Sequence, residues 1–99
     1  MCYTILDPGT GMSPEVCDGV GVKYIGKLTD GQTFDESADP VIFNLSTLIG
    51  GWQLGIPLIK TGGKIRLFIP PSLGYGNQAT GTIPANSILV FDIDLVAIY

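Results

Sequence analysis

The chain has 99 residues, of which 45% are hydrophobic, and it carries a formal net charge of −4. This length suits a single domain with one core, and the apolar content argues against disorder. With five basic residues and no apolar run near the roughly 20 residues that cross a bilayer, we expect neither nucleic-acid binding nor membrane insertion.

Alternating apolar and polar residues predict that most of the chain forms β-strands. Short strands are expected at residues 2–6 and 41–45, and longer ones at residues 20–28, 64–70 and 87–99. Each longer segment places its apolar residues on one face, which is typical of half-buried antiparallel strands. Turn residues separate them at Pro8-Gly9, Asp30-Gly31 and Gly62-Gly63.

One stretch, STLIGGWQLGIPLI at residues 46–59, has helical spacing. Its apolar face would carry Leu48, Ile49 and Trp52, and Ser46 or Thr47 is the expected N-cap. Two consecutive glycines each cost about 1 kcal/mol relative to alanine, so this helix must be short and held by packing. The predicted fold is α+β: an antiparallel sheet of about five strands with one short helix, in a single domain over residues 1–99.

The usual catalytic groups are scarce. The chain has no histidine, which removes the commonest general base and most zinc and copper sites. Asp35 and Glu36 are adjacent and would point apart, so they are a poor acid–base pair. Asp92 and Asp94 suit a solvent-facing strand surface, and Lys60, Lys64 and Arg66 are interpreted as a solvated strand edge. Cys2 and Cys17 are either free structural thiols or a disulfide.

Aromatic residues are the surplus, and they come from different elements. The set is Tyr24, Phe34, Phe43, Trp52, Tyr75 and Phe91. Phe43 is assigned to the hydrophobic core. The two tyrosine hydroxyls need partners if buried, and Asp35 could meet that need for one of them. As a whole, the set is better explained if some of these residues belong to the core and others line one apolar cleft that contains a few polar groups.

Three ordered segments carry a family resemblance: VKYIGKLTDGQTFDES, GGWQLGIPLIKTGGKIRLFIPPSLGYG and IPANSILVFDIDL. Together they resemble the FKBP family of peptidyl-prolyl cis/trans isomerases over nearly the whole chain. The resemblance implies a twisted five-stranded sheet wrapped around a short helix, with a proline-binding site between them. It implies no metal and no cofactor.

The resemblance also implies a role for each matching residue. Trp52 would form the floor of the pocket, with Tyr24, Phe34 and Phe91 as walls. The Asp35 carboxylate would bond the Tyr24 hydroxyl, while the Tyr75 hydroxyl and the backbone N–H of Ile49 would bond substrate carbonyls. Val41, Leu48 and Ile83 would complete the rim, and the segment from Tyr75 to Ile83 would overhang the pocket as a flap.

The implied partners are proline-containing polypeptides and, as ligands, macrolides such as tacrolimus or rapamycin. The chain departs from the family pattern in Thr47-Leu48-Ile49 where many members have Glu-Val-Ile, in lacking a basic residue after FDES, and in a flap about one residue shorter. These departures bear on macrolide affinity and substrate preference. A monomer is the expected state. The segment IPLIKTGGKIRLFIPPSLGYG is compatible with a periplasmic or surface-anchored bacterial protein. The sequence does not decide the compartment.

The sequence is compatible with three function classes. An isomerase needs no nucleophile, because rotation about an X–Pro bond breaks amide resonance and no covalent bond. A binding or chaperone module would use the same pocket with little or no turnover. A purely structural β-domain would not need Tyr24, Asp35 and Tyr75 together. The sequence favours the isomerase.

Overall fold

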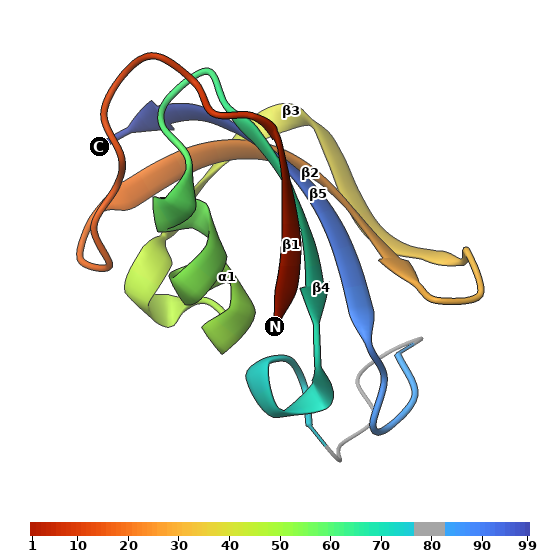
Figure 1. Cartoon of the computed structure of the whole chain (residues 1–99). Helices are drawn as coiled ribbons and strands as arrows, with labels where there is room; N and C mark the ends of the chain where they lie inside the picture. Colours follow the sequence, from red (N-terminus) through yellow and green to blue (C-terminus); the bar gives the residue numbers. More distant parts are fainter. Residues whose placement is uncertain (77–82) are drawn as a thin grey trace.

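The fold is one antiparallel sheet that curves over a short helix (Figure 1). The computed structural model describes residues 1–76 and 83–99. Within these residues, five strands pair in the order β1-β4-β5-β2-β3. They are β1 (Cys2–Asp7), β2 (Gly19–Leu28), β3 (Thr33–Asn44), β4 (Lys64–Ile69) and β5 (Leu89–Ile98), and the helix is α1 (Gly50–Gly55). The predicted α+β class is confirmed.

The hydrophobic core lies between the sheet and α1. Alternate residues of the three inner strands face the helix, so β4 and β5 each bury every second side chain. The buried side chains are Val20, Val22, Leu28, Leu45, Trp52, Ile56, Ile59, Ile65, Leu67, Ile69, Ile83, Leu89, Phe91, Ile93 and Leu95. Because the strand period is two, the opposite face of the sheet carries the charged residues of these strands together with exposed apolar side chains such as Phe68.

The helix is shorter than predicted and begins differently. A 3₁₀ helix, Leu45–Thr47, precedes it, and the Asn44 side chain caps that turn by accepting from the Ser46 N–H. The residue before α1 is Ile49, which makes no side-chain cap. The expected cap by Ser46 or Thr47 was therefore wrong, because both residues belong to the preceding turn. A second 3₁₀ helix, Ile56–Leu58, continues α1.

Two strands differ from the expectation. β3 begins at Thr33 instead of residue 41, because its first half is a polar edge strand with a register shift between Val22 and Tyr24 of β2. β4 is an interior strand, so the strand-edge interpretation of Lys64 and Arg66 was wrong. Both cations reach the neighbouring strand: Arg66 donates to both carboxylate oxygens of Asp92, and Lys64 lies 3.8 Å from Asp94.

Cys2 and Cys17 are both free and exposed. Among the helices in residues 1–76 and 83–99, none is long and apolar enough to span a membrane. A third 3₁₀ helix, Pro71–Leu73, follows β4 and leads to Tyr75 beside the cavity described next.

Candidate functional site

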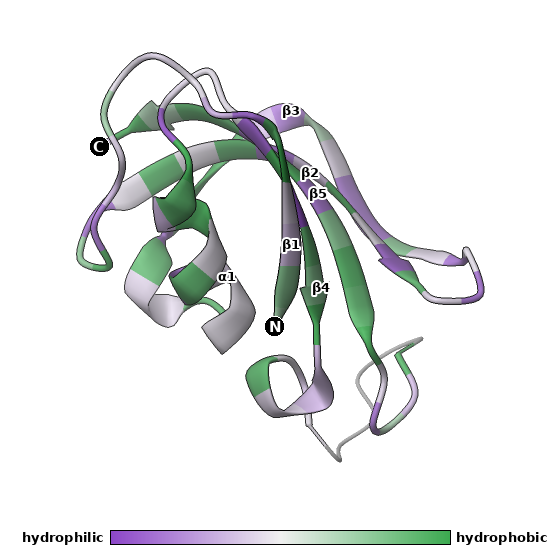
Figure 2. Cartoon of the chain, viewed as in Figure 1, coloured by the Kyte–Doolittle hydropathy of each residue, from purple (hydrophilic) through white to green (hydrophobic). Residues whose placement is uncertain are grey.

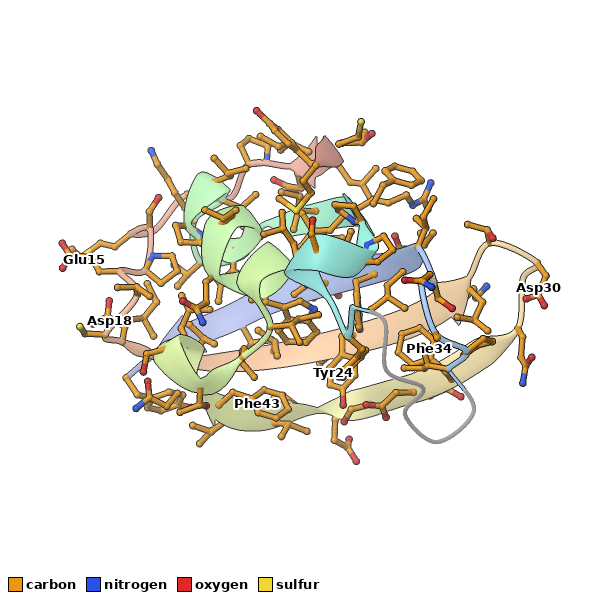
Figure 3. The ribbon with its side chains drawn as sticks, turned by 90° about the horizontal axis from the view of Figure 1, so that it is seen from below. Glu15, Asp18, Tyr24, Asp30, Phe34 and Phe43 are labelled. Atoms are coloured by element: carbon orange, nitrogen blue, oxygen red, sulfur yellow. The ribbon has the colours of Figure 1, made fainter. Side chains whose placement is uncertain are left out.

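An apolar cavity of about 160 Å³ opens between α1 and the β2–β3 side of the sheet. Elements far apart in the sequence supply its walls, which is why strand pairing is needed to assemble it. The lining residues are Tyr24, Asp35, Phe43, Leu48, Ile49, Trp52, Tyr75 and Phe91. Figure 3 shows Phe43 and Phe34 toward opposite ends of β3, with Tyr24 of β2 between them.

Trp52 of α1 lies at the centre of the aromatic cluster. Its ring meets the rings of Tyr24, Phe43 and Phe91 in T-shaped contacts, with centroid separations of 5.2, 5.9 and 5.1 Å respectively. Edge-to-face contacts of this kind are the arrangement that aromatic quadrupoles favour. The side chain is only 4% exposed. Its neighbours therefore fix the indole in one orientation at the base of the cavity.

The indole nitrogen of Trp52 is an exception to the usual pairing of buried polar groups. Nε1 is buried and has no hydrogen-bond partner among the described residues. Most buried donors are paired, so an unpaired one at the base of a cavity marks this tryptophan as more than core filling.

The segment before α1 is held in place by the side chain of Gln53, for which the sequence pattern gave no signal. The Gln53 side-chain amide donates to the Leu48 carbonyl at 2.7 Å and to the Ser46 carbonyl at 3.3 Å. This positions Leu48 and Ile49 at the rim of the cavity. In the described part of the chain, the backbone N–H of Ile49 donates to no acceptor, which leaves it available beside the opening.

Tyr24 and Asp35 form the expected hydrogen bond. The Tyr24 hydroxyl donates to Asp35 Oδ2 at 2.9 Å. The strand register explains this contact: Asp35 pairs with Gly26, so Tyr24 is its diagonal neighbour on the same face. Burial, followed by the hydrogen bond to Asp35, raises the pKa of Tyr24 to about 12. The hydroxyl therefore stays protonated at neutral pH.

The cavity brings together seven of the ten residues expected at the site, namely Tyr24, Asp35, Leu48, Ile49, Trp52, Tyr75 and Phe91. Phe34, Val41 and Ile83 are not among the residues that line it. Phe34 packs edge-on against Phe91, with ring centroids 5.4 Å apart, and so supports a wall from behind. Val41 is half-buried on β3, and Ile83 is a core residue that is 5% exposed.

Phe43 lines the cavity, so its assignment to the core alone was wrong. The side chain is half-buried and contacts both Trp52 and Tyr24. Its alternation with Asn44 and Ile42 on β3 was a usable signal, because it places Phe43 on the face of the sheet that carries Tyr24. The expected flap from Tyr75 to Ile83 includes residues 77–82, which lie outside the described residues.

Comparison with known proteins gives this geometry a family. The sequence profile of the FKBP-type peptidyl-prolyl cis-trans isomerases matches residues 11–96. The chain belongs to this family. It is 46% identical over 99 residues to the FKBP-type peptidyl-prolyl cis-trans isomerase FkpA of Aeromonas hydrophila, covering 97% of this chain and 37% of that protein.

Solved structures of the family share the fold. The crystal structure of FkpA from Escherichia coli superposes with a TM-score of 0.94 at 44% identity, covering 97% of this chain and 46% of that one. The crystal structure of AtFKBP13 superposes with a TM-score of 0.88 at 33% identity, covering 96% of this chain and 90% of that one. The chain thus spans less than half the length of the FkpA proteins it matches and most of the length of AtFKBP13.

Proposed function

We propose that this chain is a peptidyl-prolyl cis-trans isomerase that accelerates rotation about X–Pro bonds in polypeptides. The observation that carries the proposal is the aromatic cavity of about 160 Å³ in a member of the FKBP-type family. Its volume is below the roughly 300–1,000 Å³ of pockets that enclose drug-sized ligands, so it suits one small ring with the rest of the ligand outside. In this proposal residues 1–99 form one isomerase domain.

In the proposed mechanism the prolyl ring rests on Trp52, between Tyr24 and Phe91. Phe34 and Phe43 support these walls, and Val41, Leu48 and Ile83 contribute to the apolar surroundings. The planar amide has a large dipole that water solvates well, and the twisted amide has a smaller one. A dry aromatic cavity therefore destabilises the planar form more than the twisted form, which lowers the barrier of about 20 kcal/mol.

Two hydrogen-bond donors at the opening would hold the substrate backbone. Tyr75 and Ile49 both line the cavity, and in this proposal the Tyr75 hydroxyl and the Ile49 backbone N–H would each bond a substrate carbonyl. The Asp35 carboxylate holds the Tyr24 ring through its hydroxyl, so that this wall keeps its orientation. Fixing the flanking carbonyls while the prolyl amide rotates converts binding energy into orientation. No acid, base or nucleophile is needed.

Exchange NMR on a blocked Leu-Pro peptide tests the proposal. We expect the wild type to accelerate cis–trans exchange, and we expect rapamycin, a proposed ligand of the same cavity, to suppress it. Tyr75→Phe removes only the hydroxyl and should lower kcat/KM by about five- to tenfold, the range for one hydrogen bond of about 1 kcal/mol or slightly more. Tyr3→Phe on β1 is the matched control, because Tyr3 is 50% exposed and is not among the cavity-lining residues.

A folded wild type that binds the peptide and leaves its exchange rate unchanged would refute the isomerase proposal. The chain would then be a proline-binding module, which is the second function class that the sequence allows. Equal losses in Tyr75→Phe and Tyr3→Phe would refute the role of the Tyr75 hydroxyl and leave the activity itself standing.

A further inference from the structure

Asp35 is the only charged residue among the eight described residues that line the cavity. We propose that its carboxylate makes the site favour proline segments with a lysine or arginine close to the prolyl residue over segments with an acidic residue there. This inference rests on the proposed function, since it concerns the substrates of the same cavity.

The Asp35 carboxylate is only partly used by the protein. Oδ2 accepts the Tyr24 hydroxyl, and Oδ1 accepts no hydrogen bond from any described residue. An ionised carboxylate has about four lone-pair positions, so most of its accepting capacity stays open. The residue is exposed and lies on edge strand β3, whose hydrophilic stretches are visible in Figure 2. A ligand in the cavity therefore passes beside a free carboxylate oxygen.

No basic side chain of the protein is placed to neutralise this charge. Lys64 and Arg66 pair with Asp94 and Asp92, and they alternate with the core-facing residues of β4. Lys23 and Lys27 of β2 are exposed and lie on the sheet face opposite Tyr24, because neighbouring strand residues point to opposite faces. The fifth basic residue, Lys60, is in the turn before β4, where its backbone N–H donates to the Pro8 carbonyl.

The segment outside the described residues does not alter this balance. Residues 77–82 read NQATGT and contain no ionisable side chain. Wherever they lie, they bring neither a cation to Asp35 nor a further anion. The five basic side chains of the whole sequence are thus all accounted for, and the formal net charge of −4 reinforces the local field.

The physical consequence is a modest and salt-dependent selectivity. A solvent-exposed ion pair changes a dissociation constant by about 1.4- to fivefold, and an acidic side chain beside Asp35 is disfavoured for the same reason. At about 1 M salt the Debye length falls to about 3 Å, so the preference should largely disappear. At low salt, therefore, charge would distinguish between proline segments that fit the apolar cavity equally well.

Three blocked peptides test this inference. They share a Leu-Pro core and differ only in carrying Lys, Gln or Glu at one flanking position, which is varied in turn on either side of the core. Dissociation constants come from NMR titration and kcat/KM from exchange NMR. For the wild type at low salt we expect affinity in the order Lys, Gln, Glu, with about a 1.4- to fivefold step between Lys and Gln at one or both positions.

Two variants with the same change in charge separate the site from the general field. Asp35→Asn keeps an oxygen that accepts the Tyr24 hydroxyl, and the Lys-to-Glu ratio should fall to near one. Glu36→Gln is the matched control, since Glu36 pairs with Ile25 and points to the opposite face of β3 from Asp35. It should retain most of the ratio.

Equal affinity for the three peptides at low salt, or an unchanged ratio in Asp35→Asn, would overturn the inference. Because affinity is measured separately from turnover, its failure differs from failure of the proposed function. Charge-selective binding without accelerated cis–trans exchange would refute only the isomerase proposal. Accelerated exchange without charge selectivity would refute only the role of Asp35.

Discussion

Gly51 lies directly against the side chain of Ile69. A Cβ atom at position 51 would come within 2.6 Å of Cδ1 and Cγ1 of Ile69, closer than real contacts allow. Gly55, one turn later, has the same relationship with Leu67, at 2.5 Å from Cδ2. The two glycines therefore let the backbone of α1 pack directly against side chains of β4. This close packing places Trp52 at the base of the cavity.

The first prediction is that Gly51→Ala destabilises the protein. Overpacking against the fully buried Ile69 should cost about 1–3 kcal/mol, and the better helix propensity of alanine offsets up to about 1 kcal/mol of it. Urea unfolding followed by tryptophan fluorescence measures the net loss. Leu54→Ala on the same helix is the control, because Leu54 is 56% exposed and should change stability by less than about 0.5 kcal/mol. A Gly51→Ala variant more stable than wild type, as the helix propensity of alanine alone would make it, would disprove the close-packing explanation.

The second prediction concerns alkaline pH. The folded-state pKa of Tyr24 is raised to about 12 by burial and by Asp35, from an ordinary value of 10.0. Above pH 10 the unfolded chain loses this proton and the folded chain retains it, so stability from this group is complete below pH 10 and is lost between about pH 10 and 12. Tyr24→Phe should therefore show a shallower decline in unfolding free energy over this range. The other tyrosines are common to the wild type and the variant, so their titration cancels in the comparison. Parallel curves of unfolding free energy against pH would contradict the prediction.

The third prediction is that Phe43 contributes to substrate binding. Phe43→Leu keeps an apolar side chain and removes the edge-to-face contact with Trp52, which is worth about 0.5–1.5 kcal/mol. We expect kcat/KM for a Leu-Pro peptide to fall by about two- to tenfold. Phe68→Leu makes the same change on β4, where Phe68 is 37% exposed on the face of the sheet away from α1. Exchange NMR on both variants decides the question, and equal effects would assign Phe43 to the core alone.

The fourth prediction is that the Arg66–Asp92 pair supports the sheet and plays no part in the site. The bond from Arg66 Nε to Asp92 Oδ1 is 2.7 Å long, and its second contact makes it bidentate. Asp92 accordingly raises the pKa of Arg66 above its usual value. A double-mutant cycle with Arg66→Gln and Asp92→Asn should give a small favourable coupling in urea unfolding, and a smaller one at high salt. Loss of peptide isomerisation in these folded variants would be inconsistent with their place on the opposite face.

Local pattern was enough to predict the strands that carry the core. In β4 and β5 every second residue is buried, so alternation alone identified both strands and their inner faces. The same rule failed for the first half of β3, where polar residues and Pro40 occupy an edge strand with a register shift. Edge strands are half solvated and tolerate proline, so they leave little signal in the sequence.

Neighbour relationships were harder to predict than elements. Arg66 looked like an edge residue because alternation does not say which strand lies alongside, and here the partner strand begins 23 positions later, at Leu89. The Tyr24–Asp35 contact followed from the family resemblance, and its register was not visible in the sequence. Phe43 was misassigned for a similar reason, because only the packing of α1 against β2 and β3 separates a core side chain from one that lines the cavity.

β5 is the last strand in the sequence and the middle strand of the sheet. β5 lies between β4 on one side and β2 on the other (Figure 1). It also supplies Phe91 to the cavity. Until residues 89–98 are present, the β1–β4 pair and the β2–β3 pair have no strand to join them. During translation, therefore, the strands of both halves of the sheet emerge before β5, and the aromatic cavity can close only after β5 has left the ribosome.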